Sequence, residues 1–402
     1  IGAALAQFKA VTRKPKILIA DTIKGRGVSF MEHTAMESNA ALYRFHSGAP
    51  DQETYAKAVA ELLEAANAQL RRVGRTALRT LTTDRPHRPS LEGMQRMVAA
   101  YSAALVKHAR EDPRIVALDA DLVLDCGLIP FKDQFPERFF ECGIAEMDMV
   151  SQAGGMALRG LLPVVHSFAC FLSTRPNEQI YNNATERTKI VYVGSLAGLL
   201  PAGPGHSHQC VRDISSLGAI PGLTLIEPAD EIETALALDY CLNMATHSSY
   251  LRLVSIPCRI PYTLPDGYAL RRGVGVTLLE GKDALVFGYG PVLLPQAFEA
   301  AQLLHARGIS LKVVNLPWLN CVDDAWLRQT VSGFSQVFTL DNHYIAGGQG
   351  EMIAAALARL GIHTHVATLG VEDIPKYGQN DEALSAHRLD ARSIADAIAL
   401  SA

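Results

Sequence analysis

The chain has 402 residues, 49% of them apolar and 19% charged, which is too long for one ordinary domain and typical of two or three with large cores. A net charge of −4, a pI near 6.4 and the lack of any lysine or arginine block argue against nucleic acid or an anionic membrane surface as the main partner. The seven cysteines are scattered without a CxxC pair or Cys/His metal spacing, and no signal peptide or bilayer-length apolar run is found, so we expect a cytoplasmic protein with reduced thiols.

The N-terminal part predicts only a fragment of a domain. "IGAALAQFKAV" is typical of the end of an amphipathic helix, and "KPKILIADTIKG", residues 14–25, of a short buried strand. One helix and one strand cannot enclose a core, so we interpret residues 1–70 as the C-terminal tail of a domain whose body lies upstream or on another polypeptide. The basic, proline-bearing stretch over residues 71–90 predicts a linker.

Strands and helices alternate over residues 91–262 and again over 270–402. In the first range "RIVALDADL", "LPVVHSF" and "KIVYVGSL" predict strands, and in the second "DALVFGYG", "LKVVNLPWL" and "SQVFTLDNH" do so. Continuous apolar strands joined by helical segments form parallel sheets that are covered on both faces. We therefore predict an α/β protein with two doubly wound, mostly parallel-sheet domains, preceded by the end of a third α/β domain.

Local chemistry alone does not name an activity. In "FFECGIAEMDM", residues 139–149, Glu146 enters the first turn of an otherwise apolar helix, where the macrodipole favours a carboxylate by a few tenths to about 1 kcal/mol. "GPGHSHQ" contains the pair His206 and His208, but no third metal ligand is near in sequence, and the segment matches no phosphate-binding glycine loop. We interpret it as a polar loop.

The order of several motifs over nearly the whole chain is more informative. They are "DTIKGRGVSFME", "FHSGAP", "VALDADL", "ERFFECGIAEMDM", "PVVHSFACF", "GHSHQCVRDISSLGAIPGLTLIEPADEIET", "TLDNHYIAGGQGEMIA" and "GQNDEALSAHRLDARSIADAI". In this order they resemble the transketolase family of thiamine diphosphate enzymes, and most of all the split transketolases. The resemblance implies a diphosphate-domain tail, a pyrimidine-binding domain and a transketolase C-terminal domain, the last supporting a dimer.

The resemblance also implies which residues hold the cofactor. Glu146 matches the glutamate that hydrogen-bonds N1′ of the aminopyrimidine and thereby helps to remove the proton from C2 of the thiazolium. Such a carboxylate must be buried, because water would weaken its hold on N1′. Phe171 and Phe168 match aromatic walls of the pyrimidine site, although each could equally be a core aromatic. Asp121 matches a carboxylate near the thiazolium. Without the resemblance, we would interpret it as an aspartate that caps the turn at the end of a strand.

Histidines complete the predicted catalytic set. His46 matches a histidine beside the diphosphate and substrate, and His208 matches one that contacts substrate oxygens. With Glu146 they would be the catalytic residues, carrying protons and hydrogen-bonding a developing alkoxide. His166 is a weaker candidate for the same pocket. The implied reaction moves a two-carbon ketol unit between a sugar donor and acceptor, through a carbanion that thiamine diphosphate stabilises.

Two departures from the family pattern matter. The Gly-Asp-Gly…Asn motif that holds Mg²⁺ and the diphosphate is absent from these 402 residues, so we expect the Mg²⁺ ligands elsewhere and a homodimer or a heterotetramer with a diphosphate-binding subunit. The second departure concerns the sugar-phosphate clamp. Its residues fall at Val98, Asp125, Leu196 and Ser255, and an aspartate that reads a donor hydroxyl falls at Pro204.

Without that clamp a phosphate dianion would be repelled by Asp125 rather than held. Arg175 and Arg252 could compensate from nearby positions, and we count all three among the candidate substrate-binding residues with His46 and His208. We therefore expect at least one substrate to be an unphosphorylated or nucleotide-linked sugar.

Two other functions stay open. One is decarboxylative carboligation from a 2-oxo acid, of the deoxyxylulose-phosphate synthase or oxo-acid dehydrogenase β type, which carbon dioxide release from pyruvate would reveal. The other is a degenerate homologue that serves as a structural or regulatory subunit. The carboxylate and aromatic pair at Glu146 and Phe171 argues against the second, since a non-catalytic copy does not need it.

Overall fold

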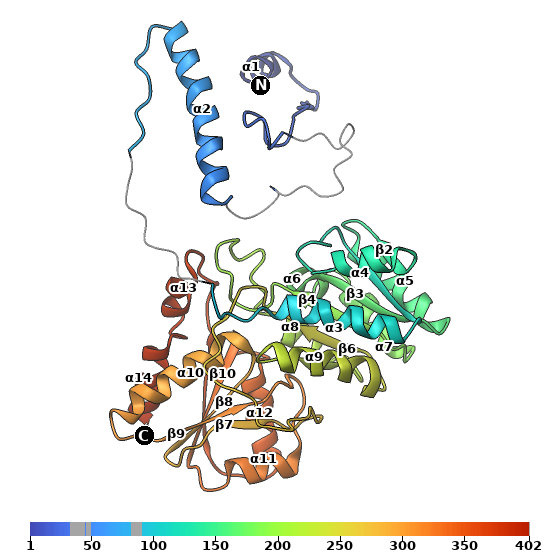
Figure 1. Ribbon diagram of the computed structural model, residues 1–402, viewed down its shortest axis with the longest axis vertical. Helices are drawn as coiled ribbons and strands as arrows, with labels where there is room; N and C mark the ends of the chain where they lie inside the picture. Colours follow the sequence, from blue (N-terminus) through green and yellow to red (C-terminus); the bar gives the residue numbers. More distant parts are fainter. Residues whose placement is uncertain (33–44, 46–49, 82–90, 402) are drawn as a thin grey trace. The chain divides into compact units, whose positions relative to one another are not determined.

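The computed structural model describes residues 1–32, 45, 50–81 and 91–401, and the chain divides into two units, residues 1–89 and 90–402. The described part of the first unit contains helices α1 (Gly2–Ala10) and α2 (Gln52–Arg72), and the second unit contains both sheets (Figure 1). No helix within these described ranges is long and apolar enough to cross a membrane.

Helix α2 is defined by a cap and by contacts with the segment before it. The carboxylate of Asp51 accepts a hydrogen bond from the backbone nitrogen of Thr54 at 2.8 Å, which satisfies a free donor of the first turn. The backbone nitrogen and hydroxyl of Ser29 both donate to Glu61 of α2, at 2.7 and 2.8 Å. The helix therefore holds part of the preceding polar stretch.

The strand predicted at residues 14–25 is wrong. No strand forms in the described residues of the first unit, and Ile17 and Ile19 are 82% and 88% exposed. An extended apolar segment becomes a strand only where a neighbouring strand takes up its backbone hydrogen bonds along its length, and the described residues of this unit contain no strand. The predicted helix at the N-terminus is confirmed as α1.

Six parallel strands form the first sheet of the second unit, in the order β2-β1-β3-β4-β6-β5. The strands are β1 (Ile115–Asp119), β2 (Phe139–Glu141), β3 (Leu162–Phe168), β4 (Val191–Ser195), β5 (Thr224–Ile226) and β6 (Ser249–Arg252). The helices between them are α3 (Met97–Glu111), α4 (Ile129–Gln134), the 3₁₀ turn Pro136–Arg138, α5 (Glu146–Leu158), α6 (Ala169–Leu172), α7 (Asn177–Thr185), α8 (Asp213–Leu217), α9 (Glu231–Asp239) and the π-helical turn Tyr240–Met244.

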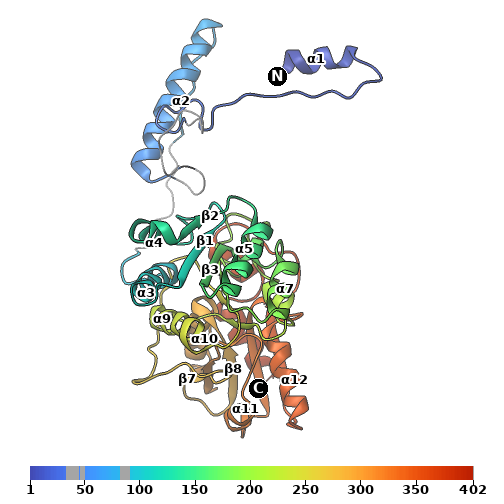
Figure 2. The ribbon, with the colours of Figure 1, turned by 90° about the vertical axis from the view of Figure 1, so that its right-hand side faces the viewer.

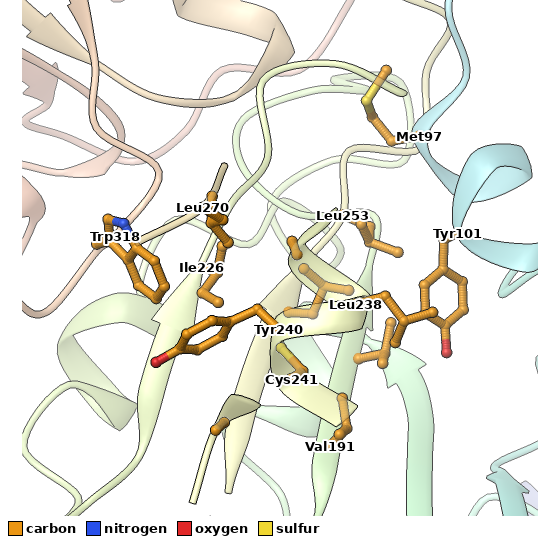
Figure 3. Packing of buried hydrophobic residues seen from close by; sticks show 14 of the residues in the cluster. Met97, Tyr101, Val191, Ile226, Leu238, Tyr240, Cys241, Leu253, Leu270 and Trp318 are labelled. Carbon is orange, nitrogen blue, oxygen red and sulfur yellow. The ribbon is translucent and has the colours of Figure 1, made fainter. Parts of the chain in front are cut away.

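Helices cover both faces of this sheet because alternate strand residues point to opposite sides. Ala117 of β1 belongs to one apolar cluster, in which Tyr101 of α3 and Leu238 of α9 also lie (Figure 3 shows these two). Its neighbour Val116 belongs to another cluster, with Met149 of α5. Helices α3 and α9 lie side by side in both views (Figures 1 and 2). Because both faces are covered, the strands are largely continuous runs of apolar residues in the sequence.

Five strands form the second sheet, in the order β11-β10-β8-β9-β7, and only the pairing of β7 with β9 is antiparallel. They are β7 (Val276–Leu279), β8 (Ala284–Gly288), β9 (Leu311–Asn315), β10 (Gln336–Tyr344) and β11 (His365–Val371). Their helices are α10 (Gly290–His305), α11 (Asp324–Val331), α12 (Gln349–Arg359), α13 (Asn380–Ala386) and α14 (Ala391–Ser401). The predicted α/β class with two doubly wound, mostly parallel-sheet domains is confirmed.

One apolar cluster extends across both sheets. The ring of Tyr240 lies 4.9 Å from that of Trp318, which follows β9, and both belong to a single apolar cluster (Figure 3). In the "LDNH" motif of β10, Asn342 accepts a hydrogen bond from the backbone nitrogen of Leu199 at 2.9 Å. Asp341 accepts from the backbone nitrogen of Gln349 at 2.8 Å and so caps α12. This motif packs an interface within the chain.

Candidate active site

A tight turn places Glu146 at the start of α5. Gly143 adopts a positive φ of 65°, a conformation that a side chain would strain, and its backbone nitrogen donates to the carboxylate of Glu141 at 2.8 Å. The same carboxylate accepts from the backbone nitrogen of Asp121 at 2.9 Å. The turn between β2 and α5 is thereby fixed, and the side chain of Glu146 is only 4% exposed.

Glu146 does not lie unpaired in the interior. Its Oε1 atom accepts from Nη1 of Arg175 at 2.5 Å, and the side chain of Arg175 is 40% exposed. The guanidinium group also lies over the ring of Phe171, 3.9 Å from its centre. Arg175 and Phe171 are four residues apart in one helical turn, where the backbone nitrogen of Arg175 donates to the oxygen of Phe171, so both project to the same side. The sequence suggested Arg175 as a substrate contact and did not predict this pairing with Glu146.

Three of the predicted site residues meet beside this ion pair. The ring of Phe171 lies 5.4 Å from that of His208, and the ring of Phe168 lies 5.9 Å from both. Phe168 ends β3 and is buried, whereas Phe171 and His208 are half-buried and so partly open to a ligand. Nδ1 of His208 lies 3.0 Å from the hydroxyl of Ser207, which orients the imidazole. Glu146, Phe168, Phe171 and His208 thus form one cluster with Arg175.

The carboxyl end of β1 contributes two acidic residues. Asp121 is exposed, has a positive φ of 61°, and within the described part of the chain forms no hydrogen bond or ion pair with the cluster. Asp119 is fully buried and was not predicted. Its Oδ2 accepts from the backbone nitrogen of Leu122 at 2.7 Å, and its Oδ1 has no hydrogen-bond partner among the described residues. Burial raises the pKa of Asp119 to about 7, and the Glu141 carboxylate acts in the same direction.

A cavity of about 770 Å³ lies between α3 and α4. Its lining includes all four positions where the sequence analysis placed the lost phosphate clamp, namely Val98, Asp125, Leu196 and Ser255. Arg96 and Arg110 also line the cavity, and the guanidinium of Arg110 is bonded to Gln134 at 2.6 Å. These four positions therefore meet in space, although they are far apart in the sequence.

Arg252 must be withdrawn from the candidate substrate contacts. It is fully buried, and its guanidinium donates to Asp213 at 2.8 Å, to Glu227, and to the backbone oxygens of Cys210 and Asn342 at 2.7 and 2.8 Å. Every face of the group is taken by protein, so none is left for a sugar. Arg252 therefore connects the two sheets and does not contact a substrate.

His166 is also not a lining residue. It is fully buried, and its Nδ1 donates to the backbone oxygen of Leu118 at 3.0 Å, so that Nε2 accepts from the Tyr101 hydroxyl at 2.5 Å. Burial lowers the pKa of His166 to about 4, and the ring is neutral at pH 7. His46 lies outside the described residues. Within the described residues, no three His, Cys, Asp or Glu side chains group as metal ligands.

Comparison with known proteins identifies the family. Residues 94–255 match the model of the transketolase pyrimidine-binding domain, and residues 273–394 match that of the transketolase C-terminal domain. A Methanocaldococcus jannaschii protein named, provisionally, as a transketolase C-terminal section is 30% identical over 306 residues, which cover 75% of this chain and 95% of that protein. The chain belongs to the transketolase family. The cluster around Glu146 lies wholly within its pyrimidine-binding domain.

Other members of the transketolase family differ in how much of them this chain covers. A solved split-gene transketolase, described as an inactive β4 tetramer, matches with a TM-score of 0.69 and 30% identity over 76% of this chain and 97% of that one. The 1-deoxy-D-xylulose-5-phosphate synthase of Carboxydothermus hydrogenoformans is 32% identical over 296 residues, 72% of this chain but 46% of the synthase. The chain therefore spans about half the length of that curated relative.

Proposed function

We propose that this chain is the pyrimidine-binding and C-terminal part of a thiamine diphosphate-dependent enzyme that transfers a two-carbon ketol unit between sugars. The observation that carries the proposal is the cluster in which the buried carboxylate of Glu146 is bonded to Arg175, whose guanidinium lies on the ring of Phe171 next to His208. A carboxylate that served only the helix macrodipole would gain nothing from burial beside aromatic rings. We therefore assign Glu146 to the binding of the cofactor.

The residues present fit an aminopyrimidine. The guanidinium of Arg175, a planar nitrogen group, stacks on Phe171 while it is bonded to Glu146, so a planar nitrogen heterocycle that replaced it would find the same two partners. Glu146 would hydrogen-bond the ring nitrogen, and Phe171 and Phe168 would provide apolar walls. When bound, thiamine diphosphate would supply a thiazolium that accepts the electrons of the transferred two-carbon unit. Asp121, at the end of the neighbouring strand, would lie near that ring.

His208 and His46 are the proposed proton carriers. Since Nδ1 of His208 is engaged by Ser207, its Nε2 is the atom that would meet a substrate oxygen. A positioned acid or base of this kind contributes about 10²–10⁴-fold to rate. Mg²⁺ and the diphosphate would be held outside these 402 residues, by a diphosphate-binding subunit in a homodimer or heterotetramer. Two relatives support a partner subunit: the archaeal protein is named as a C-terminal section, and the split-gene transketolase was solved as an inactive β4 tetramer.

The substrate is proposed to differ from an ordinary pentose phosphate. The cavity between α3 and α4 has Val98 and Leu196 as apolar lining and Asp125 as an anion where a phosphate clamp would need cations. A charge-assisted contact to phosphate is worth about 1.5–3 kcal/mol, so these clamp positions would bind a phosphate group poorly, and the two arginines of the lining, Arg96 and Arg110, occupy other positions in the cavity. An unphosphorylated or nucleotide-linked sugar fits it better.

The experiment is a ketol-transfer assay on the native assembly, isolated from its source through a tag on this chain. Thiamine diphosphate and Mg²⁺ are added, and unphosphorylated, phosphorylated and nucleotide-linked ketoses are offered as donors with a common aldehyde acceptor. We expect cofactor-dependent transfer that the Glu146→Gln variant abolishes. A preference for xylulose 5-phosphate would contradict the substrate proposal, and no transfer with any donor would contradict the reaction.

The likeness to 1-deoxy-D-xylulose-5-phosphate synthase favours one second candidate. In that case the assembly would join the two-carbon unit of a 2-oxo acid to an aldehyde, with loss of carbon dioxide. Carbon dioxide release from pyruvate by the same preparation distinguishes it from ketol transfer. A protein that binds the cofactor but carries out neither reaction would be a degenerate subunit.

A further inference from the structure

The guanidinium of Arg175 occupies part of the proposed cofactor site. It is held on two sides, at 2.5 Å by Oε1 of Glu146 and at 3.9 Å by the face of Phe171. Its plane and its N–H donors resemble those of an aminopyrimidine. The group therefore lies in the space that the proposed function gives to the pyrimidine ring.

The two occupants exclude each other. A second planar group could not stack on the same face of Phe171 while the guanidinium lies 3.9 Å from it, because that separation is already van der Waals contact. The Oε1 atom of Glu146 is also occupied by Nη1 of Arg175, whereas the proposed role needs this carboxylate to hydrogen-bond a ring nitrogen. Arg175 must leave Glu146 before the ring can bind.

Arg175 is able to leave. Its side chain is 40% exposed, in contrast to Arg252, whose guanidinium is fixed on all sides by buried protein groups. Water can solvate the guanidinium as it leaves, and the buried carboxylate of Glu146 is then partnered by the ring nitrogen of the cofactor. The contact of Arg175 with Glu146 and Phe171 can therefore fill the subsite when the cofactor is absent and break when the cofactor binds.

We propose that Arg175 closes the pyrimidine subsite of the cofactor-free protein by imitating the aminopyrimidine, and that cofactor binding displaces it. The inference rests on the proposed function, since it concerns the same subsite. Arg175 then acts as a gate that lowers apparent cofactor affinity, because the fraction of protein with an open site limits binding.

The test compares Arg175→Met, Arg175→Lys and Arg159→Met with the wild type, in the native assembly freed of cofactor. Arg159 is an exposed arginine at the far end of α5 and controls for loss of one charge. Binding of thiamine diphosphate with Mg²⁺ is measured by calorimetry, and the melting temperature is measured with and without them. We expect Arg175→Met to bind roughly tenfold more tightly, and Arg175→Lys to lie between it and the wild type, because lysine keeps the charge without the planar group.

The melting temperatures give a second readout. Arg175→Met should melt below the wild type without cofactor and level with it when saturated, because the ion pair exists only in the closed state. Equal or weaker cofactor binding by Arg175→Met, with Arg159→Met unchanged, overturns the gate but leaves the proposed function standing. If no protein binds the cofactor, the proposed function fails. The fragment 4-amino-2-methylpyrimidine, observed by NMR, then decides the gate: tighter binding by Arg175→Met supports it, and equal or absent binding overturns it.

Discussion

Arg252, at the end of β6, donates a hydrogen bond to the backbone oxygen of Asn342 on β10 at 2.8 Å and so joins the two sheets. The same guanidinium contacts Asp213 and Glu227, and none of the three side chains is exposed. Two buried carboxylates and one buried cation are tolerated only together, because each alone would be an unpaired charge in the interior. The contact between the pyrimidine-binding and C-terminal domains therefore depends on this network.

Replacing Arg252 with methionine should destabilise the protein strongly. The variant leaves Asp213 and Glu227 without their cation, and we expect the free energy of unfolding to fall by about 3–5 kcal/mol. Urea denaturation followed by circular dichroism measures the change. Arg159→Met, which removes an exposed charge, serves as the control and should change stability little. If both variants unfold at the same urea concentration, the network does not hold the domains together.

Glu146→Gln should abolish ketol transfer without unfolding α5. We expect activity to fall by at least about 100-fold, since the amide cannot exchange a proton with the cofactor ring. Asp148→Asn is the matched control, because Asp148 lies in the same first turn but is exposed. It removes the same helix-dipole contribution, worth about 0.3–1 kcal/mol, and should leave activity intact. Equal losses in both variants would mean that Glu146 only supports the helix.

The two histidines of the "GPGHSHQ" loop should behave differently. His208 contacts Phe171 and Phe168, and we expect His208→Asn to reduce kcat/KM by about 10²-fold or more, because substrate oxygens lose their proton carrier. His206 is exposed in the same loop, and His206→Asn should have little effect. Steady-state kinetics with the best donor sugar measures both. A larger loss for His206→Asn would place the substrate elsewhere in the loop.

Changing the cavity lining should alter donor preference. The double variant Val98→Arg with Asp125→Ser adds a cation and removes an anion at the cavity between α3 and α4. We expect its kcat/KM ratio for phosphorylated over unphosphorylated ketoses to rise by about tenfold or more. Val98→Leu with Asp125→Ser controls for side-chain size. An unchanged ratio would show that this cavity does not receive the end of the donor that carries the phosphate.

Asp119 should make stability depend on pH. Its pKa is raised to about 7 in the folded protein from an ordinary value of 3.8, so between these pH values the folded state keeps a proton that the unfolded state has lost. Its contribution to stability is therefore lost as the pH rises through this window, by a few kcal/mol in all. Asp119→Asn cannot titrate.

The difference in unfolding free energy between Asp119→Asn and the wild type isolates this effect from other groups, His166 included. We expect the unfolding free energy of the variant, relative to that of the wild type, to rise steadily from pH 5 to pH 7 and to stay constant above pH 7. A difference that stays constant over this range would show that Asp119 is ionised in the folded protein throughout.

The local sequence pattern predicts the central strands of the sheets but not all of the edge strands. Strands β1, β3 and β4 are buried on both faces, so their apolar runs predict them directly. The edge strands β2 and β7 have three and four residues and are half-exposed, and they were missed because only pairing with a neighbour makes them strands. The reverse holds at residues 14–25, where an apolar run forms no strand in the described part of the chain.

The sequence by itself determined the alternation of strands and helices and the family, and it proposed Glu146, Phe171 and His208 as site residues, because periodicity and motif order are properties of the chain. The tertiary structure alone decided the partners of the arginines. Arg175 and Arg252 both looked like substrate contacts, yet one lies on Glu146 and the other is buried between the sheets. A long charged side chain pairs with whichever carboxylate the fold brings near and shields from water. The residues next to an arginine in the sequence do not show which carboxylate that will be.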